Sequence, residues 1–275
     1  MGTQTTERRR AFLDPELDAA IQRDGYVVVD DFLAAEQVQR LHDLLDPSIG
    51  DDHEGLVFSN MITDPEARAR VERGIGEVVG PPLLGLLDRY RLAASLFVLK
   101  LPGDAGRRIW HADPALVDER RFTSISAWCP LTDVDEHNGA FTVIEGSHQE
   151  IPIVRGGVEI QGLLFPSEDE VTTRCGGTRR PLRMRAGQAL LYEHRLAHGS
   201  PPNQGDRRRW AVNVPAIPVE APLIHYIRQA DGEVDVYELP DDYFYGHDAS
   251  IPVATDPNAR RVARIATGTT DWSAA

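Results

Sequence analysis

Cysteine is scarce in this sequence, with only Cys129 and Cys175 among 275 residues. A disulfide framework in a small secreted domain uses more cysteines, and neither of these has a neighbouring cysteine with which to form a zinc–thiolate cluster. We therefore expect two reduced thiols.

Long hydrophobic runs are also missing: no stretch approaches the ~18 apolar residues that span a bilayer, and the start, MGTQTTERRRAF, lacks the apolar segment of a signal peptide. The sequence predicts no membrane association and a cytoplasmic location.

Lysine is almost absent, since Lys100 accompanies 28 arginines among the 29 basic residues. Acidic residues number 43, which gives a formal net charge of −14. An acidic chain repels phosphate backbones, so nucleic acid is not expected as a partner. A GC-rich coding bias explains the preference for arginine. One retained lysine in such a chain indicates a specific chemical need.

The remaining composition is globular, with 41% hydrophobic residues, and the length suits one domain spanning residues 1–275. We expect a loose arm over residues 1–13 and a mainly helical flank over 14–91. Within that flank, local patterns predict helices over residues 14–24, 34–46, about 64–79 and 82–90.

From Leu92 onward, short apolar runs are separated by proline, glycine and asparagine turns, which is typical of an all-β sandwich or barrel. This β core is predicted to extend over residues 92–240 and to end in a hairpin over 223–239. Residues 152–180 are glycine-rich, charged and irregular, and we interpret them as an active-site lid loop. The C-terminal extension, 241–275, contains the aromatic cluster Tyr243, Phe244 and Tyr245, which is expected to pack on the barrel.

The strongest local motif is WHADP, in which His111 and Asp113 are two residues apart. On an extended strand, residues i and i+2 point the same way, so this imidazole and carboxylate can reach one point. Such a pair supplies two ligands of the two-histidine–one-carboxylate triad that leaves open positions on iron(II). His198, 87 residues later at the end of an apolar run, is the candidate third ligand. His194, four residues before His198, would lie roughly 13 Å from it on a strand at ~3.3 Å per residue, and we interpret it as structural.

Three arginines, Arg207 to Arg209, precede the next apolar run. Strand alternation places Arg209 on the face of Asn213, and Arg208 on the opposite face with Trp210. The planar guanidinium fork suits a carboxylate, so Arg209 is the candidate to bind one inside the barrel, and Arg208 is expected outside. Lys100, on the strand before the WHADP motif, could also reach a carboxylate.

Four stretches of the chain resemble the phytanoyl-CoA dioxygenase family of iron(II)/2-oxoglutarate oxygenases, in the family's order and spacing. They are RDGYVVVDDFLAAEQVQRL, WHADP, SAWCPLTDVDEHNGAFTVIEGSH and GQALLYEHRLAHGSPPNQGDRRRWAV. The resemblance implies a mainly β fold with flanking helices, the double-stranded β-helix or jelly-roll (cupin-like) barrel. Two positions depart from the family's pattern: Glu145 replaces a proline and Gln188 an acid, and neither is a metal ligand.

The resemblance also implies the roles of individual residues. His111, Asp113 and His198 match the iron ligands, and Arg209 and Ser200 match residues that bind 2-oxoglutarate. Trp128 matches an aromatic residue of the cleft. Related halogenases replace the carboxylate with a small residue so that chloride binds iron, and the presence of Asp113 therefore disfavours halogenation.

The expected activity is oxidation, by default hydroxylation, of a small organic metabolite, as in natural-product tailoring. Fe(II), 2-oxoglutarate and O2 are the expected cofactors and co-substrates, with ascorbate added in vitro, and succinate and CO2 are released. The protein is expected to be a monomer or homodimer. A coenzyme A thioester is a less attractive substrate, because no further basic patch awaits its phosphates. Two alternatives stay open: a cupin-type metal enzyme that does not use 2-oxoglutarate, and a non-catalytic jelly-roll binding module.

Overall fold

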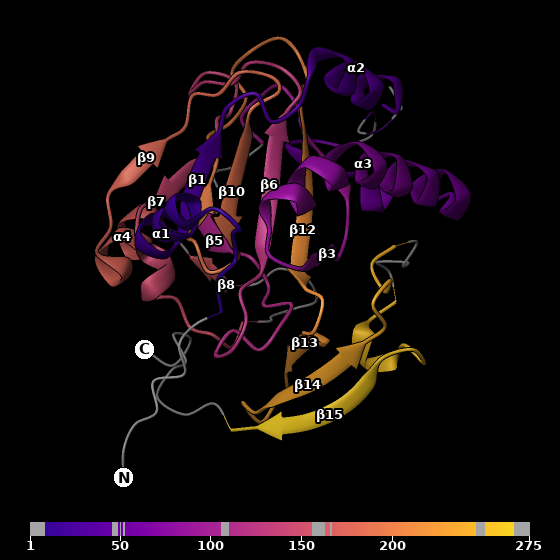
Figure 1. Ribbon diagram of the computed structural model, residues 1–275, viewed down its shortest axis with the longest axis vertical. Helices are drawn as coiled ribbons and strands as arrows, with labels where there is room; N and C mark the ends of the chain where they lie inside the picture. Colours follow the sequence, from indigo (N-terminus) through magenta and orange to yellow (C-terminus); the bar gives the residue numbers. More distant parts are fainter. Residues whose placement is uncertain are drawn as a thin grey trace.

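The computed structural model describes residues 9–45, 49, 51, 53–105, 110–155, 163–165, 167–245 and 251–266 (Figure 1). Its helices are α1 (Pro15–Asp24), α2 (Ala35–Asp43), α3 (Pro65–Leu86) and α4 (Glu168–Cys175), with 3-10 turns η1 (Ser59–Met61), η2 (Ser147–Gln149) and η3 (Val253–Thr255). Its strands are β1 (Tyr26–Val29), β2 (Leu56–Phe58), β3 (Tyr90–Leu92), β4 (Leu96–Lys100), β5 (Trp110–Ala112), β6 (Ile125–Pro130), β7 (Thr142–Ile144), β8 (Leu163–Phe165), β9 (Arg179–Pro181), β10 (Ala189–Glu193), β11 (His198–Gly199), β12 (Arg209–Pro218), β13 (Leu223–Arg228), β14 (Val234–Leu239) and β15 (Arg260–Ile265).

Two antiparallel sheets form the barrel, and the predicted double-stranded β-helix is confirmed. The larger has the order β1-β10-β6-β12-β4-β2, with β3 also paired to β12, and the smaller has the order β8-β5-β11-β7-β9. Alternate side chains of the larger sheet, such as Trp128 and Tyr192, pack against Phe141 and Val143 in one buried cluster with the smaller sheet. The functional side chains described below lie between these sheets.

The opposite face of the larger sheet is covered by helices (Figure 1). Ile75 and Leu83 of α3 share a buried cluster with Trp210 and Val212 of β12. The prediction of two helices over 64–90 is wrong, because α3 continues through Pro81 and Pro82. Proline within a helix loses a hydrogen bond and crowds the preceding turn, and here the buried apolar face on both sides of the prolines offsets that cost.

The N-terminal arm differs from the prediction where the structure describes it. Ala11 and Phe12 are buried, and both of their backbone N–H groups donate to the Asp18 carboxylate. Leu13 N donates to Leu86 O, which ties the arm to the end of α3. Residues 9–13 are therefore docked rather than loose, while residues 1–8 lie outside the described residues.

Segment 152–180 is more regular than its glycines and charges indicated. Ser167 caps α4 by accepting a hydrogen bond from Glu170 N, and Gly176 ends the helix in a left-handed conformation. Here the glycine and the charged residues lie at the ends of a helix. The prediction of an irregular segment was therefore wrong for the residues of α4. Residues 156–162 and 166 lie outside the described residues, and the lid interpretation stays a prediction.

The predicted hairpin is confirmed as β13 and β14, which pair in register from Leu223 and Leu239. It belongs to a third sheet that is completed by β15 from the C-terminal extension, seen below the barrel in Figure 1. Among the described residues, no helix is both long and apolar enough to cross a membrane.

Candidate metal centre and its cavity

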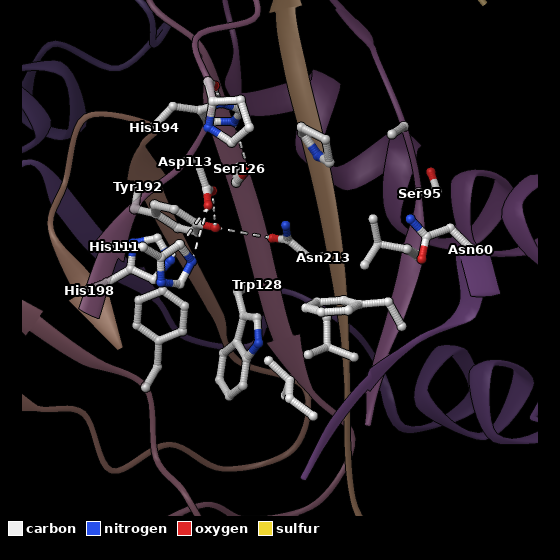
Figure 2. A pocket seen from close by; sticks show the side chains of 18 of the residues that line it. Asn60, Ser95, His111, Asp113, Ser126, Trp128, Tyr192, His194, His198 and Asn213 are labelled. Carbon is white, nitrogen blue, oxygen red and sulfur yellow. Dashed lines mark hydrogen bonds and ion pairs between the residues drawn. The ribbon is translucent and has the colours of Figure 1, made fainter. Parts of the chain in front are cut away.

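Two paired strands bring the three predicted ligands together. His198 of β11 is the direct register partner of His111 of β5, and Asp113 follows β5 by one residue. Asp113 Oδ1 lies 3.5 Å from His111 Nε2 and 3.6 Å from His198 Nε2. One ligand atom from each residue lies within 4.8 Å of the others, and Figure 2 shows the three side chains converging. Two imidazole nitrogens and one carboxylate on one side of a metal suit iron(II) with open positions.

Neighbouring groups fix the orientation of two ligands. The Tyr192 hydroxyl donates to Asp113 Oδ2 at 2.8 Å, which leaves Oδ1 facing the histidines. His198 Nδ1 lies 2.9 Å from the backbone oxygen of Leu196, so Nδ1 carries the proton and Nε2 is available. Phe141 stacks on the His198 ring at 4.7 Å between centroids.

The protonation states suit metal binding. Burial opposes ionisation of Asp113, but the nearby His198 and His111 hold the pKa of its carboxyl well below the usual range. Burial, together with His111, lowers the pKa of His198 to about 3. Burial and the Asp113 carboxylate raise the pKa of Tyr192 far above its ordinary value. At neutral pH the site therefore offers an ionised carboxylate and a neutral imidazole, as a metal requires.

Arg209 provides a buried positive charge in the same cavity. It is 3% exposed, and its Nε and Nη1 have no hydrogen-bond partner among the described residues. Its guanidinium lies over the Trp128 ring at 5.4 Å, and burial lowers its pKa to about 10. Because buried charged donors are normally paired, these two unpartnered nitrogens can donate to an incoming carboxylate such as that of 2-oxoglutarate.

The neighbouring arginine lies outside the barrel, as strand alternation requires. Arg208 Nη2 contacts Asp51 Oδ1 at 2.5 Å, and its Nη1 donates to Ile49 O at 3.2 Å. Trp210, on the same face, packs into the core beneath the helices. The structure therefore places Arg209, and not Arg208, in the cavity wall.

Lys100 lies directly across from Arg209 in the β4–β12 register. Its ammonium donates to the backbone oxygen of Ser200 at 3.1 Å, to the Ser200 hydroxyl and to the backbone oxygen of Pro201. Ser200 and Trp128 line the cavity. These contacts hold the turn after His198, and direct contact of Lys100 with a co-substrate stays a prediction.

His194, interpreted as structural, and Cys129, expected to be a reduced thiol, have ordinary partners or surroundings. His194 Nε2 lies 2.9 Å from Ser126 Oγ, and its Nδ1 lies 2.9 Å from the backbone oxygen of Pro114. Cys129 is fully buried in the core, and burial raises the pKa of its thiol. Neither side chain is placed to bind the metal.

Sequence reasoning missed a buried ion pair behind the metal site. Arg155 contacts both carboxylate oxygens of Glu119, at 2.6 and 2.7 Å, and its Nε donates to the backbone oxygen of Asp113 at 2.8 Å. The side chain of Arg155 is 0% exposed and that of Glu119 is 4% exposed. No local pattern marks this pair, because its members lie 36 residues apart in segments without strand alternation.

Tyr192 was also missed, although alternation from Leu190 would have placed it inside the barrel.

The metal site opens into a cavity of about 480 Å³. Its walls run from His111, Asp113 and His198 past Trp128 and Asn213 to residues of α3, η1 and β4. Figure 2 shows Asn213 and Trp128 between the histidines and the labelled Asn60 and Ser95. The walls are mainly apolar, which is typical of a small-molecule site.

Comparison with known proteins agrees with this geometry. The family model described as phytanoyl-CoA dioxygenase matches residues 21–211. The ectoine dioxygenase of Nocardia farcinica is 24% identical over 217 residues, covering 67% of this chain and 71% of the relative. The structure of EctD from S. alaskensis with 2-oxoglutarate and 5-hydroxyectoine matches with a TM-score of 0.51 at 23% identity, covering 89% of this chain and 93% of that one. The epimerase SnoN, solved with Fe3+, alpha ketoglutarate and nogalamycin RO, matches with a TM-score of 0.54 at 20% identity. The match covers 93% of this chain and 96% of that one. The predicted family, fold and enzyme class are confirmed.

Proposed function

The chain belongs to the phytanoyl-CoA dioxygenase family and is an iron- and 2-oxoglutarate-dependent oxidoreductase, and from that premise we propose that it hydroxylates a small organic metabolite. One observation carries the proposal: a His–Asp–His triad and an arginine with unpartnered N–H groups face the same cavity. The triad supplies the metal ligands, and the arginine supplies the partner for the far carboxylate of 2-oxoglutarate. The overall reaction consumes O2 and 2-oxoglutarate and releases succinate and CO2.

His111, Asp113 and His198 would hold the iron. When bound, the metal would supply the oxidising chemistry for which O2 and 2-oxoglutarate are consumed. The unpartnered Nε and Nη1 of Arg209 would donate to the co-substrate from the β12 side. Phe141 and Trp128 exclude water from this end of the cavity, since both are buried and lie in its wall.

The substrate is proposed to be a free small molecule rather than a coenzyme A thioester. A cavity of about 480 Å³ suits a compact metabolite, and its wall contains Arg209 as the only arginine or lysine among the described lining residues. A thioester would bring several phosphate charges to a chain of net charge −14. Two of the similar proteins fit a free metabolite by their names, an ectoine dioxygenase and an epimerase solved with nogalamycin RO.

The test is a succinate-release assay with Fe(II), ascorbate, 2-oxoglutarate and a metabolite panel under air. Succinate and an oxidised product in equal amounts, both dependent on added iron, are the expected result. A cupin-type enzyme that does not use 2-oxoglutarate would oxidise its substrate without forming succinate. A binding module would form neither, and either result would overturn the proposal.

A further inference from the structure

Asn213 is a polar side chain in the middle of the larger sheet. On β12 it shares the inner face with Arg209, and its register partners are Trp128 on β6 and Leu96 on β4. All four side chains line the cavity, and Asn213 is half-buried. Figure 2 shows its amide between the metal ligands and the far end of the cavity, where Asn60 lies.

The Asn213 amide is separated from a metal ligand by a single hydroxyl group. The Tyr192 hydroxyl lies 2.8 Å from Asp113 Oδ2 and 3.5 Å from Asn213 Oδ1. A hydroxyl has one proton, and the closer, charged acceptor Asp113 takes it. Among the described residues, Asn213 has no other hydrogen-bond partner. An amide offers two N–H donors and two lone pairs, so most of its hydrogen-bonding capacity is unused.

Other polar side chains around the metal ligands already have partners or a role. Ser126 Oγ lies 2.9 Å from His194 Nε2, and His194 Nδ1 lies 2.9 Å from the backbone oxygen of Pro114. Arg209 is assigned to 2-oxoglutarate. A polar group of the substrate that lies near the metal ligands would therefore find its partner in Asn213.

The surroundings of Asn213 in the cavity are mainly apolar. The lining side chains of β2, β4, the loop after β5 and the C-terminal extension are Phe58, Leu96, Val98, Leu116 and Phe244. Apolar contact is not directional, so one or a few polar groups normally fix the orientation of a ligand in such a site. A substrate without a polar group would displace water from the Asn213 amide and leave it unpaired, which is unfavourable. The amide is neutral and can both donate and accept, so a hydroxyl or a carbonyl group fits it.

We propose that Asn213 orients the substrate, with its amide bound to a hydroxyl or carbonyl group of the substrate. A carbon next to that group is thereby turned toward the iron. This rests on the proposed function only in taking the cavity to be the substrate site. It names the substrate class: an organic molecule with a neutral oxygen group close to the carbon that is oxidised.

Two probes of similar size test this role: 2-phenylethanol and (2-fluoroethyl)benzene, in which a weakly hydrogen-bonding fluorine replaces the hydroxyl. Their binding to the protein loaded with Fe(II) and 2-oxoglutarate is measured by anaerobic calorimetry. In Asn213→Leu the affinity of the alcohol relative to the fluoride should fall about tenfold, because the buried hydroxyl loses its partner. An unchanged relative affinity, or an alcohol without measurable binding to the wild-type protein, overturns the proposal.

Asn60→Leu is the matched control, because it removes the amide at the far end of the same cavity. It should keep the wild-type relative affinity, and a fall as large as that in Asn213→Leu would contradict the proposal. An alcohol bound to the iron itself would keep its relative affinity in Asn213→Leu, which also contradicts it. Asn213→Thr suits a strand but has a shorter polar group, and should lower the relative affinity about threefold. An unchanged value in Asn213→Thr overturns the proposal if Asn213→Leu does not fold.

Two further measurements test the position of the bound probe. With Mn(II) in place of iron, relaxation of the probe's protons by the metal falls steeply with distance. The CH2 protons next to the hydroxyl should relax faster than the ring proton opposite the side chain, and the reverse order contradicts the proposal. The dissociation constant for 2-oxoglutarate should be unchanged in Asn213→Leu. A large rise would assign the amide to the co-substrate and overturn the proposal.

The binding measurements involve no oxygen and no turnover, so they separate the two proposals. An alcohol preference that depends on Asn213, without succinate formation, would support the orienting role and remove the proposed function. Succinate formation without that dependence would do the reverse.

Discussion

The metal end of the cavity is held by paired strands, whereas its far end is formed by a helix, a 3-10 turn and the C-terminal extension. At the metal end, His111 and His198 are cross-strand register partners, and Asp113 is oriented by Tyr192. At the far end, Glu72 comes from α3 and Phe244 from the C-terminal extension, beyond the family match that ends at residue 211. We therefore expect the chemistry to depend on sheet register and substrate choice to depend on the elements packed around the sheet. Substitutions at the two ends should affect different measurements.

Asp113→Ala should have the largest effect, because it removes one of three ligands and leaves only two imidazoles. We expect loss of bound iron and of all product, with the fold retained. Iron content per chain after anaerobic dialysis, succinate yield and the melting temperature measure these outcomes. Substantial product formation by this variant would refute the metal assignment.

Arg209→Ala should raise the apparent dissociation constant for 2-oxoglutarate about 30-fold or more. Removing the cation leaves a buried carboxylate unpaired, which costs roughly 2–5 kcal/mol. Arg209→Lys should recover only part, since a point charge does not reproduce the planar fork. Anaerobic titration of the Fe(II) protein, followed by its visible charge-transfer band, is the measurement.

Arg208→Ala is the matched control, because Arg208 pairs with Asp51 at the surface and a surface pair contributes little. It should change the 2-oxoglutarate constant only slightly. A large rise in the dissociation constant for Arg208→Ala and a small one for Arg209→Ala would show that Arg209 is not the arginine that binds 2-oxoglutarate.

Arg155→Ala should weaken metal binding about 10-fold or more, although Arg155 touches no ligand side chain. Its Nε holds the backbone oxygen of Asp113, and loss of such outer contacts typically costs 10–100-fold in metal affinity. The melting temperature should also fall, because Glu119 is left buried without its main partner. Cobalt(II) titration by its visible absorption measures affinity independently of activity.

Arg120→Ala provides the control from the loop that contains Glu119, since Arg120 is exposed and pairs with Asp118. It should leave cobalt affinity unchanged. If both variants bound cobalt as the wild type does, Arg155 would be a purely structural residue.

Phe244→Ala should have the smallest effect and should act only at the far end. Removing a half-buried ring from the wall should weaken binding of the substrate found in the metabolite panel by about fivefold, corresponding to ~1 kcal/mol of lost apolar contact. The dissociation constant for 2-oxoglutarate should not change. A change in that constant equal to the change in substrate binding would show that the two ends are not independent.

Strand periodicity explains which parts of the site could be predicted. The spacing of His111 and Asp113 places both on one side of a strand, and alternation separates Arg209 from Arg208. Both inferences need only local geometry. Helix α3 could not be predicted as one helix, because Pro81 and Pro82 disfavour it locally and only burial against β12 compensates. The Arg155–Glu119 pair has no local signal, since its members meet only after the chain folds.

The sequence by itself placed His111 and Asp113 on one face of a strand and separated Arg209 from Arg208, because a period of two along a strand fixes which side chains share a face. The resemblance to the family, and not this period, indicated the type of barrel and supported His198 as the third ligand. Tertiary structure decided what lies opposite these residues. It brought Glu72 of α3, Ser95 near β4 and Phe244 of the C-terminal extension into one cavity wall. Contacts between segments distant in sequence depend on how helices and termini pack on the sheet, and no repeat within a single segment encodes that packing.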